Sequence, residues 1–369
     1  GSRSHSGTGF EFSVPIFSQL TATAAGRYDR YEYSGNSADK FTYALGLEYR
    51  PIDSLLLRGS YSTGFRAPDL AYLYAGPSGS SSGGTDYYRC ATEEPDVDIG
   101  DCDWSDVSFN GRSHGSINLN NETSKSATWG FVYSPLSNLD FTADYYIINL
   151  KNELIYQSSD QILRWEAPCR TGELDASSGL CQAAVGQVFR NAAGDITSVL
   201  VLPINAATHR TSGTDFKIHY LWRTDRLGSF DFNLGGTYVV TNRIQNYPGD
   251  PFVSEIEDYY DYVIPRSKAN GSITWNYGDF TTTVYGARLG GLPNYDGDQR
   301  MGPTMLYNAS FGYRWSKDLN IGVTIDNLFD SKPGRDATWT SYPYYARRWF
   351  NPTGRAYFLE LNYRFGGGH

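Results

Sequence analysis

The densest group of side chains suited to ligand binding lies near the C-terminus of the 369-residue sequence, between positions 336 and 350. Flat aromatic rings in this segment could stack on sugars or on aromatic chelators, and adjacent arginines could hold a carboxylate or an anionic metal chelate. We predict seven ligand-binding residues here: Trp339, Tyr342, Tyr344, Tyr345, Arg347, Arg348 and Trp349. The alternative for each residue is packing between loops, with the arginines pairing with the acidic side chains of other loops.

The four cysteines fall into two local pairs, each inside a segment that the sequence predicts to be a loop. Three pairings are possible. Closing a short loop is the least demanding, so we expect disulfides Cys90–Cys102 and Cys169–Cys181, formed in an oxidising compartment. A metal site is the alternative, but the cysteines have neither C-x-x-C spacing nor a nearby pair of histidines. We expect neither a metal nor a cofactor.

Two acidic stretches could bind divalent cations through carboxylate oxygens. Their acidic residues are Glu93, Glu94, Asp96, Asp98, Asp101 and Asp103 in the first, and Glu255, Glu257, Asp258 and Asp261 in the second. Solvated surface loops are the alternative for both stretches, with a disulfide crosslinking the first.

The sequence gives no indication of an enzyme. His114, His209 and His219 show no serine or aspartate constellation of a hydrolase, and no phosphate-binding glycine loop or zinc motif is present. The formal charge of −9 and the pI of about 5.1 argue against a nucleic-acid partner, which would require a basic surface. These observations disfavour an enzyme and a nucleic-acid-binding protein.

The elements that must position the candidate residues are β-strands. Leu359, Leu361 and Tyr363 alternate with polar residues, and the same period of two recurs at 41–49 and 307–315. Such alternation places apolar side chains on one face of a strand and polar ones on the other. No amphipathic helix is predicted, and no apolar run approaches the roughly 18 residues of a membrane-spanning helix.

Two kinds of connection separate the strands. Short turns such as 51–53 and 134–138 alternate with long segments, which we place at 67–120, 156–200, 244–262, 290–302 and 330–352. Short turns at one end and long loops at the other are typical of a transmembrane antiparallel β-barrel. We expect about 14 strands, near 9–15, 19–33, 38–51, 54–66, 122–135, 138–152, 196–206, 209–223, 228–243, 264–276, 279–289, 304–316, 319–328 and 353–365.

Aromatic residues concentrate at the ends of these strands, where amphipathic rings would meet a membrane interface. They include Tyr61, Trp129, Tyr133, Tyr220, Trp222, Trp275, Tyr277, Tyr313 and Trp315. Ordinary strand aromatics in a soluble all-β adhesin or propeller are the alternative.

Five short motifs follow one another along the chain. They are Tyr61-Ser-Thr-Gly-Phe-Arg-Ala-Pro-Asp-Leu70, Asn118-Leu-Asn-Asn-Glu-Thr-Ser124, Arg210-Thr-Ser-Gly-Thr-Asp-Phe216, Asp326-Asn-Leu-Phe-Asp330 and a last strand ending in Tyr363-Arg-Phe365. In this order they resemble the barrel of TonB-dependent outer-membrane receptors, although Asn121 stands where the family usually has proline.

This resemblance implies a plugged barrel of about 22 strands. It also implies an N-terminal plug domain that engages TonB, and energised uptake of a scarce nutrient such as an iron siderophore or an oligosaccharide. About 14 strands and no plug segment are present, so we expect residues 1–365 to be the C-terminal portion of such a barrel and 366–369 a short tail. The plug and the remaining strands would come from a separate chain or a missing segment, because open sheet edges are very costly in lipid.

The resemblance implies a location in the bacterial outer membrane, in contact with its lipid, with long loops extracellular and short turns periplasmic. The charges expected to face the lumen could line a transport path or tie the wall to the plug: Glu48, Arg50, Arg58, Arg314, Glu360 and Arg364. The alternative function is a self-closed 14-stranded passive channel.

Overall fold

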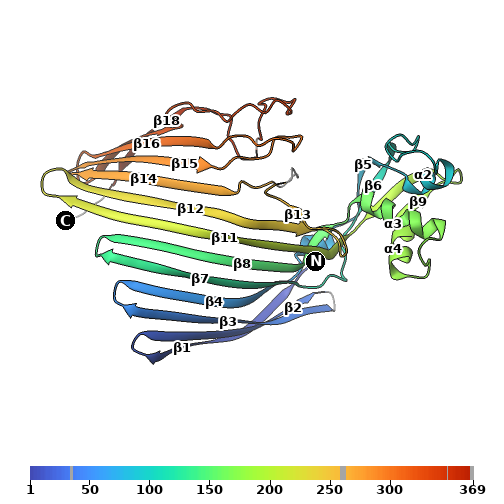
Figure 1. The fold of residues 1–369 in the computed structure, drawn as a ribbon, viewed down its shortest axis with the longest axis horizontal. Helices are drawn as coiled ribbons and strands as arrows, with labels where there is room; N and C mark the ends of the chain where they lie inside the picture. Colours follow the sequence, from blue (N-terminus) through green and yellow to red (C-terminus); the bar gives the residue numbers. More distant parts are fainter. Residues whose placement is uncertain (34–35, 258–262, 347, 366–369) are drawn as a thin grey trace.

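The computed structural model describes residues 1–33, 36–257, 263–346 and 348–365. Its main feature is one 14-stranded sheet whose strands follow one another in chain order and pair antiparallel (Figure 1). The strands are β1 (Ser4–Phe17), β2 (Leu20–Tyr33), β3 (Asn36–Ile52), β4 (Leu55–Arg66), β7 (Glu122–Leu136), β8 (Leu139–Tyr156), β11 (Pro203–Thr224), β12 (Gly228–Gln245), β14 (Ser267–Tyr277), β15 (Phe280–Leu289), β16 (Thr304–Arg314), β17 (Leu319–Asp326) and β18 (Ala356–Tyr363), with the short β13 (Val253–Ser254) pairing beside β12.

The two faces of this sheet differ in polarity, as the period of two predicts. Leu47 is 55% exposed and Leu361 is 65% exposed, and both belong to a face of aromatic and aliphatic side chains, the apolar face. The opposite face, the polar face, carries serine, threonine, glycine and charged residues such as Arg58 and Lys217. A sheet that exposes its apolar side chains on one face has the pattern of a wall in contact with lipid.

The two kinds of connection lie at opposite ends of the strands, which confirms the prediction (Figure 1). Tight turns join the strands at 18–19, 53–54, 137–138, 225–227, 278–279 and 315–318. Beside these turns Trp222, Phe230 and Trp275 form a stacked row across three strands, with neighbouring ring centroids 5.4 and 6.4 Å apart. The long segments leave from the other end.

One predicted strand of the wall was wrong. Residues 196–206 do not form a separate wall strand, because β10 (Ile196–Val201) pairs in a second, four-stranded sheet and β11 runs unbroken from Pro203 to Thr224. Residues 199–202 are all apolar, and Val199 is fully buried. Such a run is typical of a strand buried on both faces and carries no signal for the wall.

The segments predicted as irregular loops at 67–120 and 156–200 are instead largely folded. The second sheet has the order β5 (Ser78–Gly84), β6 (Val107–Ser113), β10 and β9 (Val188–Arg190), and the helices are α1 (Leu70–Tyr74), α2 (Tyr87–Glu93), α3 (Ser159–Thr171) and α4 (Gly179–Gln187). Residues 78–113 and 159–201, which we call the loop domain, project beyond the end of the wall (Figure 1). Within the described ranges, no helix combines the length and apolarity needed to cross a bilayer.

The expectation of no amphipathic helix failed at α3. Its buried residues include Ile162, Leu163 and Glu166, which lie on one side at helical spacing, and Gly172 ends it in the left-handed conformation with φ of 82°. Pro168 and a buried acidic residue within the helix obscure this pattern in the sequence. The helix packs on a core shared with Phe109 and Val199 of the second sheet.

Both expected disulfides are present in the loop domain. Cys90 pairs with Cys102, with Cα atoms 5.9 Å apart, and Cys169 pairs with Cys181, with Cα atoms 5.3 Å apart. The first joins α2 to the segment that follows it, and the second joins α3 to α4. Each long connection therefore carries its own crosslink, while the parallel pairing of β10 with β6 joins the two connections to each other.

Candidate ligand-binding site

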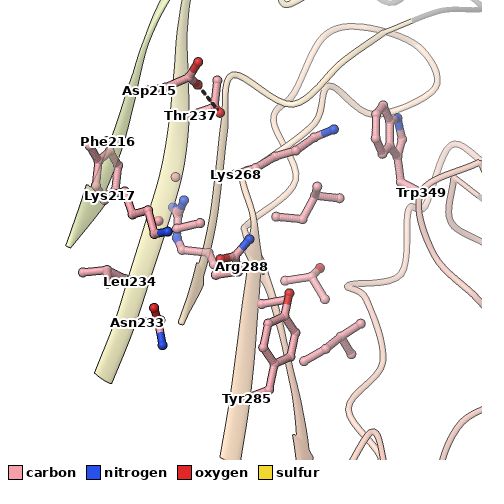
Figure 2. Close-up of a pocket in the computed structure, with 18 of the residues that line it drawn as sticks. Asp215, Phe216, Lys217, Asn233, Leu234, Thr237, Lys268, Tyr285, Arg288 and Trp349 are labelled. Carbon is pink, nitrogen blue, oxygen red and sulfur yellow. Dashed lines mark hydrogen bonds between the residues drawn. The ribbon is translucent and has the colours of Figure 1, made fainter. Parts of the chain in front are cut away.

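A cavity of about 640 Å³ lies where the polar face of the sheet, from β11 to β16, meets the loop 327–355 (Figure 2). Lys217, Asn233 and Lys268 line it from the sheet, and Trp349 and Phe350 line it from the loop. Its volume lies in the range typical of small-molecule sites, about 300–1,000 Å³. We take this cavity as the candidate ligand-binding site.

Strand register brings its polar side chains together. Lys217 on β11 is opposite Gly235 on β12, and Thr237, two positions along β12, is opposite Lys268 on β14. Residues two positions apart on a strand share a face, so both lysines project from the polar face. Gly235 and Ala287 offer little or no side chain, which leaves room between the longer groups.

The cavity is positively charged in a chain whose net charge is −9. Its charged side chains on the polar face are Lys217, Lys268 and Asp215, an excess of one positive charge; Arg288 is opposite Ala269, so its side chain belongs to the other face, where it donates to the Ser267 hydroxyl. Asp215 accepts a hydrogen bond from the Thr237 hydroxyl at 2.5 Å. In the part of the chain that the structure describes, no carboxylate lies within 4.0 Å of either lysine ammonium.

Trp349 connects the loops to the cavity. Its indole Nε1 donates a hydrogen bond to the Val263 carbonyl oxygen at 3.0 Å, which joins the loop 327–355 to the loop 246–266. The Lys268 Nζ lies 4.2 Å from the centroid of the Trp349 ring, in a cation–π contact. The ring therefore holds the lysine side chain at the upper edge of the cavity.

Of the seven predicted ligand-binding residues, Arg347 lies outside the described residues, and Trp349 is the one described member that lines this cavity. The others lie in the loop 327–355 away from the cavity. Tyr344 contacts Tyr342 edge to face at 6.2 Å, and Tyr345 contacts Phe350 in the same way at 6.0 Å. Arg348 is exposed, and Tyr342 is 72% exposed. The ligand-binding role of this group stays a prediction.

Loop packing accounts for the position of Trp339. Its ring meets Tyr295 of the loop 290–303 edge to face at 5.2 Å. Nearby, the buried Asp336 accepts hydrogen bonds from the Tyr295 amide and from the Thr338 amide, each at 2.9 Å. Asp336 thus ties two loops together and fixes the aromatic pair.

A second polar cluster fixes the loop 246–266 to the wall, and we call it the His209 cluster. The His209 Nε2 lies 2.8 Å from a carboxylate oxygen of Glu255, which also accepts a hydrogen bond from the Asn242 amide at 2.5 Å. On its other side the His209 Nδ1 is 3.8 Å from Glu153. Glu255 is buried, and its amide donates to the Asn242 carbonyl oxygen at 3.0 Å.

The protonation equilibria of this cluster are shifted by its geometry. His209 is opposite Ile244 of β12. It lies nearer to the long loops than Tyr238, an aromatic residue of the apolar face of β12. The hydrogen bond to Glu255 raises the pKa of the His209 imidazole. Burial raises the pKa of the Glu153 carboxyl, which has one oxygen without a hydrogen-bond partner. Both shifts favour the protonated forms.

Two of the charged residues predicted to face the lumen, Arg58 and Arg314, form ion pairs with acidic residues of the same sheet. Arg58 on β4 donates to Asp144 on β8 at 2.8 Å, across the intervening strand β7. Arg314 donates to Asp279 at 2.9 Å beside a tight turn. The first pair links two strands that are separated by a third, and the second links β16 to the turn between β14 and β15.

In their described residues, the two acidic stretches show no arrangement suited to a cation. In the first, Glu93 pairs with Arg89 and Glu94 accepts from the Asp103 amide at 3.1 Å. In the second, Glu255 belongs to the His209 cluster, while Asp258 and Asp261 lie outside the described residues. Across the described ranges, no group of three or more His, Cys, Asp or Glu side chains could hold a metal ion.

Sequence reasoning missed the lysines of the cavity. Lys217 and Lys268 occupy polar positions of predicted strands, which was the available signal. A strand pattern gives the face of a residue but not its neighbours, which depend on the register between strands. The two lysines are therefore recognisable as one site only in the folded sheet.

Comparison with known proteins agrees with this architecture. Among solved structures, the chain is similar to the siderophore receptor PirA of Acinetobacter baumannii, with a TM-score of 0.63 and 13% identity over 97% of this chain and 45% of that one. For a ferric enterobactin receptor (PfeA) from Pseudomonas aeruginosa the TM-score is 0.59, with 16% identity over 89% of this chain and 40% of that one. For the FrpB iron transporter from Neisseria meningitidis the TM-score is 0.58, with 13% identity over 98% of this chain and 45% of that one. No curated protein matches the sequence.

The chain thus spans less than half the length of these structures, and identities this low show the fold alone. The family model "TonB dependent receptor-like, beta-barrel" matches residues 3–328. Because this match covers most of the sequence, the chain belongs to the family of TonB-dependent receptor β-barrels.

Proposed function

We propose that this chain forms the C-terminal part of the wall and the outer loops of a receptor that takes up a ferric siderophore across the bacterial outer membrane. The observation that carries the proposal is the cavity on the polar face beneath the loop 327–355, within a wall of this family. The polar face would line the lumen, and the apolar face would meet lipid. Similar structures described as siderophore receptors support the choice of ligand.

The rest of the receptor would complete the barrel. Among the described residues no pairing joins β1 to β18, so the sheet has two open edges. Unpaired backbone groups in lipid cost several kcal/mol each, about the strength of a lost hydrogen bond in an apolar medium. Further strands and a plug, on another segment or another chain, would remove this cost, and TonB would act through the plug. The open edges disfavour the self-closed passive channel.

The orientation follows from the asymmetry of the connections. In outer-membrane barrels the short turns face the periplasm and the long loops face outward. The loop domain with its two disulfides would then be extracellular. In this role the chain binds and passes a ligand without covalent chemistry.

An oligosaccharide is the second candidate ligand. The exposed ring of Tyr342 and its neighbour Tyr344 suit stacking on a sugar. The net positive charge of the cavity has no counterpart on a neutral sugar, which favours the ferric chelate.

Uptake of radioactive iron tests the proposal. Bacteria producing the receptor would be supplied with ⁵⁵Fe-labelled ferric siderophores, with a TonB-deficient strain as the control. We expect accumulation that requires both the receptor and TonB. Accumulation that persists without TonB would instead support a passive channel, and uptake of a labelled oligosaccharide but no iron chelate would favour the second ligand.

A further inference from the structure

We propose that the outer edge of β5 in the loop domain is a docking site for an extended, basic segment of a partner polypeptide. The segment would add a fifth strand to the four-stranded sheet. This site lies outside the cavity described above, and the inference does not depend on which ligand that cavity accepts. Two features of the loop domain carry it: an edge strand that is unpaired on one side, and a group of carboxylates beside the end of that strand.

β5 forms one edge of the second sheet, whose order is β5, β6, β10 and β9. Its seven residues pair on one side with β6, from Ser78 opposite Ser113 to Gly84 opposite Val107. In an antiparallel pair, alternate residues direct their N–H and C=O groups toward the neighbouring strand, and the residues between them direct these groups away. In the described part of the chain, no strand pairs with the outward groups of β5.

The side chains of β5 leave its outer edge open. The strand reads SGSSSGG, with no charged residue, no proline and no irregularity in its register with β6. Charges, proline and bulges are the devices that keep edge strands from pairing with other chains, and short length is another. The opposite edge strand, β9, has only three residues, whereas β5 has seven, of which Ser78 to Ser81 are all exposed. A second backbone can therefore approach β5 to the spacing of neighbouring strands, about 4.8 Å.

β5 is held in its extended form without a partner on this side. Its middle is opposite Phe109, a buried residue of the loop-domain core. At its start the hydroxyls of Ser78 and Ser113 are hydrogen-bonded at 2.7 Å, and just beyond its end the Thr85 hydroxyl donates to the Ser105 carbonyl oxygen at 2.9 Å. A strand that is already ordered loses little conformational entropy when a second strand pairs with it.

Carboxylates gather at the Gly83 end of β5. Residues 90–111 contain seven acidic residues and no Lys, Arg or His. Glu93 pairs with Arg89, but five aspartates are exposed and form no ion pair within the described residues: Asp96, Asp98, Asp101, Asp103 and Asp106. A Cβ atom on Gly83 would lie 4.0 Å from the Asp106 Oδ1, so this carboxylate is directly beside the strand. These charges remain available to a basic partner.

The two features together define the chemistry of the partner. Backbone hydrogen bonds along an exposed edge supply affinity for any extended peptide, and side-chain contacts supply the selectivity. Lys or Arg side chains of the added strand would meet the aspartates that precede β6. A second copy of this chain fits less well, because its own β5 has no charged residue and brings no counter-charge to these carboxylates.

Fluorescence anisotropy with the complete receptor, purified in detergent, tests the proposal. The probe is a labelled peptide of about eight residues in which lysine alternates with threonine, long enough to span β5. One control peptide has glutamate in place of lysine. The other keeps lysine but is methylated at every amide nitrogen, so it cannot donate to a strand on either side. We expect the lysine peptide to bind, and both controls to bind about tenfold or more weakly.

A variant of β5 tests the edge itself. Ser81→Lys places a charged side chain on the exposed strand and should weaken binding of the lysine peptide about tenfold, because edge lysines oppose strand addition. Ala176→Lys adds the same charge at an exposed position between α3 and α4 and should bind like the parent protein. Equal binding by these two variants would overturn the proposal.

A second pair of variants tests the carboxylates. Asp103→Asn combined with Asp106→Asn should weaken binding about fivefold, as expected for the loss of two exposed ion pairs. Asp53→Asn combined with Asp225→Asn removes the same charge from exposed tight turns at the other end of the wall and should leave binding unchanged. A similar loss in both double variants would show that only the net charge of the receptor matters, and a basic docking site at β5 would be wrong.

Amide hydrogen exchange locates the contact. Binding of the lysine peptide should slow exchange in residues 78–84. Binding without this protection, or equal binding of the fully methylated peptide, would overturn the proposal, as would failure of the lysine peptide to bind. If the receptor without peptide sediments as a dimer that Ser81→Lys dissociates, β5 is an interface between two copies and the basic partner is wrong.

Discussion

His209 illustrates how one side chain can connect a loop to the wall. It lies between Glu255 of the loop 246–266 and Glu153 of β8, with Asn242 of β12 completing the contacts. Glu122 and Arg66 are the other charged groups that act on Glu153. Because Glu255 is followed by the fully buried Ile256, this contact fixes the point where the loop turns over the polar face.

The attachment of this loop should weaken as pH rises. A folded pKa of His209 above its ordinary 6.5 means that its contribution is fully present below pH 6.5 and is lost as pH rises through the folded value. A raised pKa of Glu153 has the same sign, because charging that buried carboxyl above its ordinary 4.5 destabilises the folded form. We expect faster amide hydrogen exchange in residues 253–257 at pH 8 than at pH 6, after correction for intrinsic rates.

The matched variants are on the same strand. His209→Gln should remove most of this pH dependence, whereas His219→Gln, near the tight turns, should leave it intact. Equal protection at both pH values in the parent protein would contradict the role assigned to the His209 cluster.

At the scale of elements, the loop domain is joined by charge as well as by strand pairing. Arg190 of β9 donates to Asp86 at 2.6 and 2.8 Å and to Glu166 of α3 at 2.7 Å. Asp86 and Glu166 come from the two different long connections, and both are almost fully buried. Burial by itself lowers the pKa of the Arg190 guanidinium, but the hydrogen bonds to Asp86 and Glu166 outweigh it and raise that pKa.

Replacing Arg190 should therefore loosen the loop domain. Arg190→Ala leaves the buried Asp86 without its guanidinium partner and leaves Glu166 with Arg170 alone. Breaking a buried pair in this way costs about 3–5 kcal/mol. Arg190→Lys keeps the charge but loses the two-pronged contact, so an intermediate effect is expected. Limited proteolysis of residues 78–113 and 159–201 would measure the change.

The control is Arg112→Ala, which removes an arginine of β6 that contacts the Phe189 ring at 5.3 Å. This variant should resist protease about as well as the parent. Undiminished resistance in Arg190→Ala would show that the core around Ile162 and Val199 and the disulfides hold the loop domain without the buried ion pairs.

For the molecule as a whole, the open sheet predicts that the purified particle contains more polypeptide than this chain. The structural match to PirA of Acinetobacter baumannii includes 97% of this chain but only 45% of PirA. Intact-mass analysis of the particle purified from outer membranes, after boiling in detergent, should reveal a plug and additional strands beyond the 41.2 kDa of this chain. A lone 41.2 kDa species with channel conductance would reverse this and make the self-closed channel the better explanation.

Local chemistry was enough to predict the wall apart from the strand placed at 196–206. The alternation in segments such as 41–49 and 307–315 is set by the pleat of a strand, and short turns against long loops indicate the two ends of the sheet. The disulfides also followed from local spacing, because the partners Cys90 and Cys102 are near in sequence. The motifs around Phe65 and Asn327 indicated the family, which the family model confirms.

Local patterns in the sequence were therefore sufficient to predict the period of most strands, the kind of each connection and the family. The folded arrangement was needed to see that 196–201 belongs to the loop domain, that Arg190 joins two distant connections, and that Lys217 and Lys268 share one cavity. The physical reason is that pleat and turn chemistry act between residues close in the chain. Strand register and the burial of charge depend on partners far apart in the sequence, which come together only when the sheet folds.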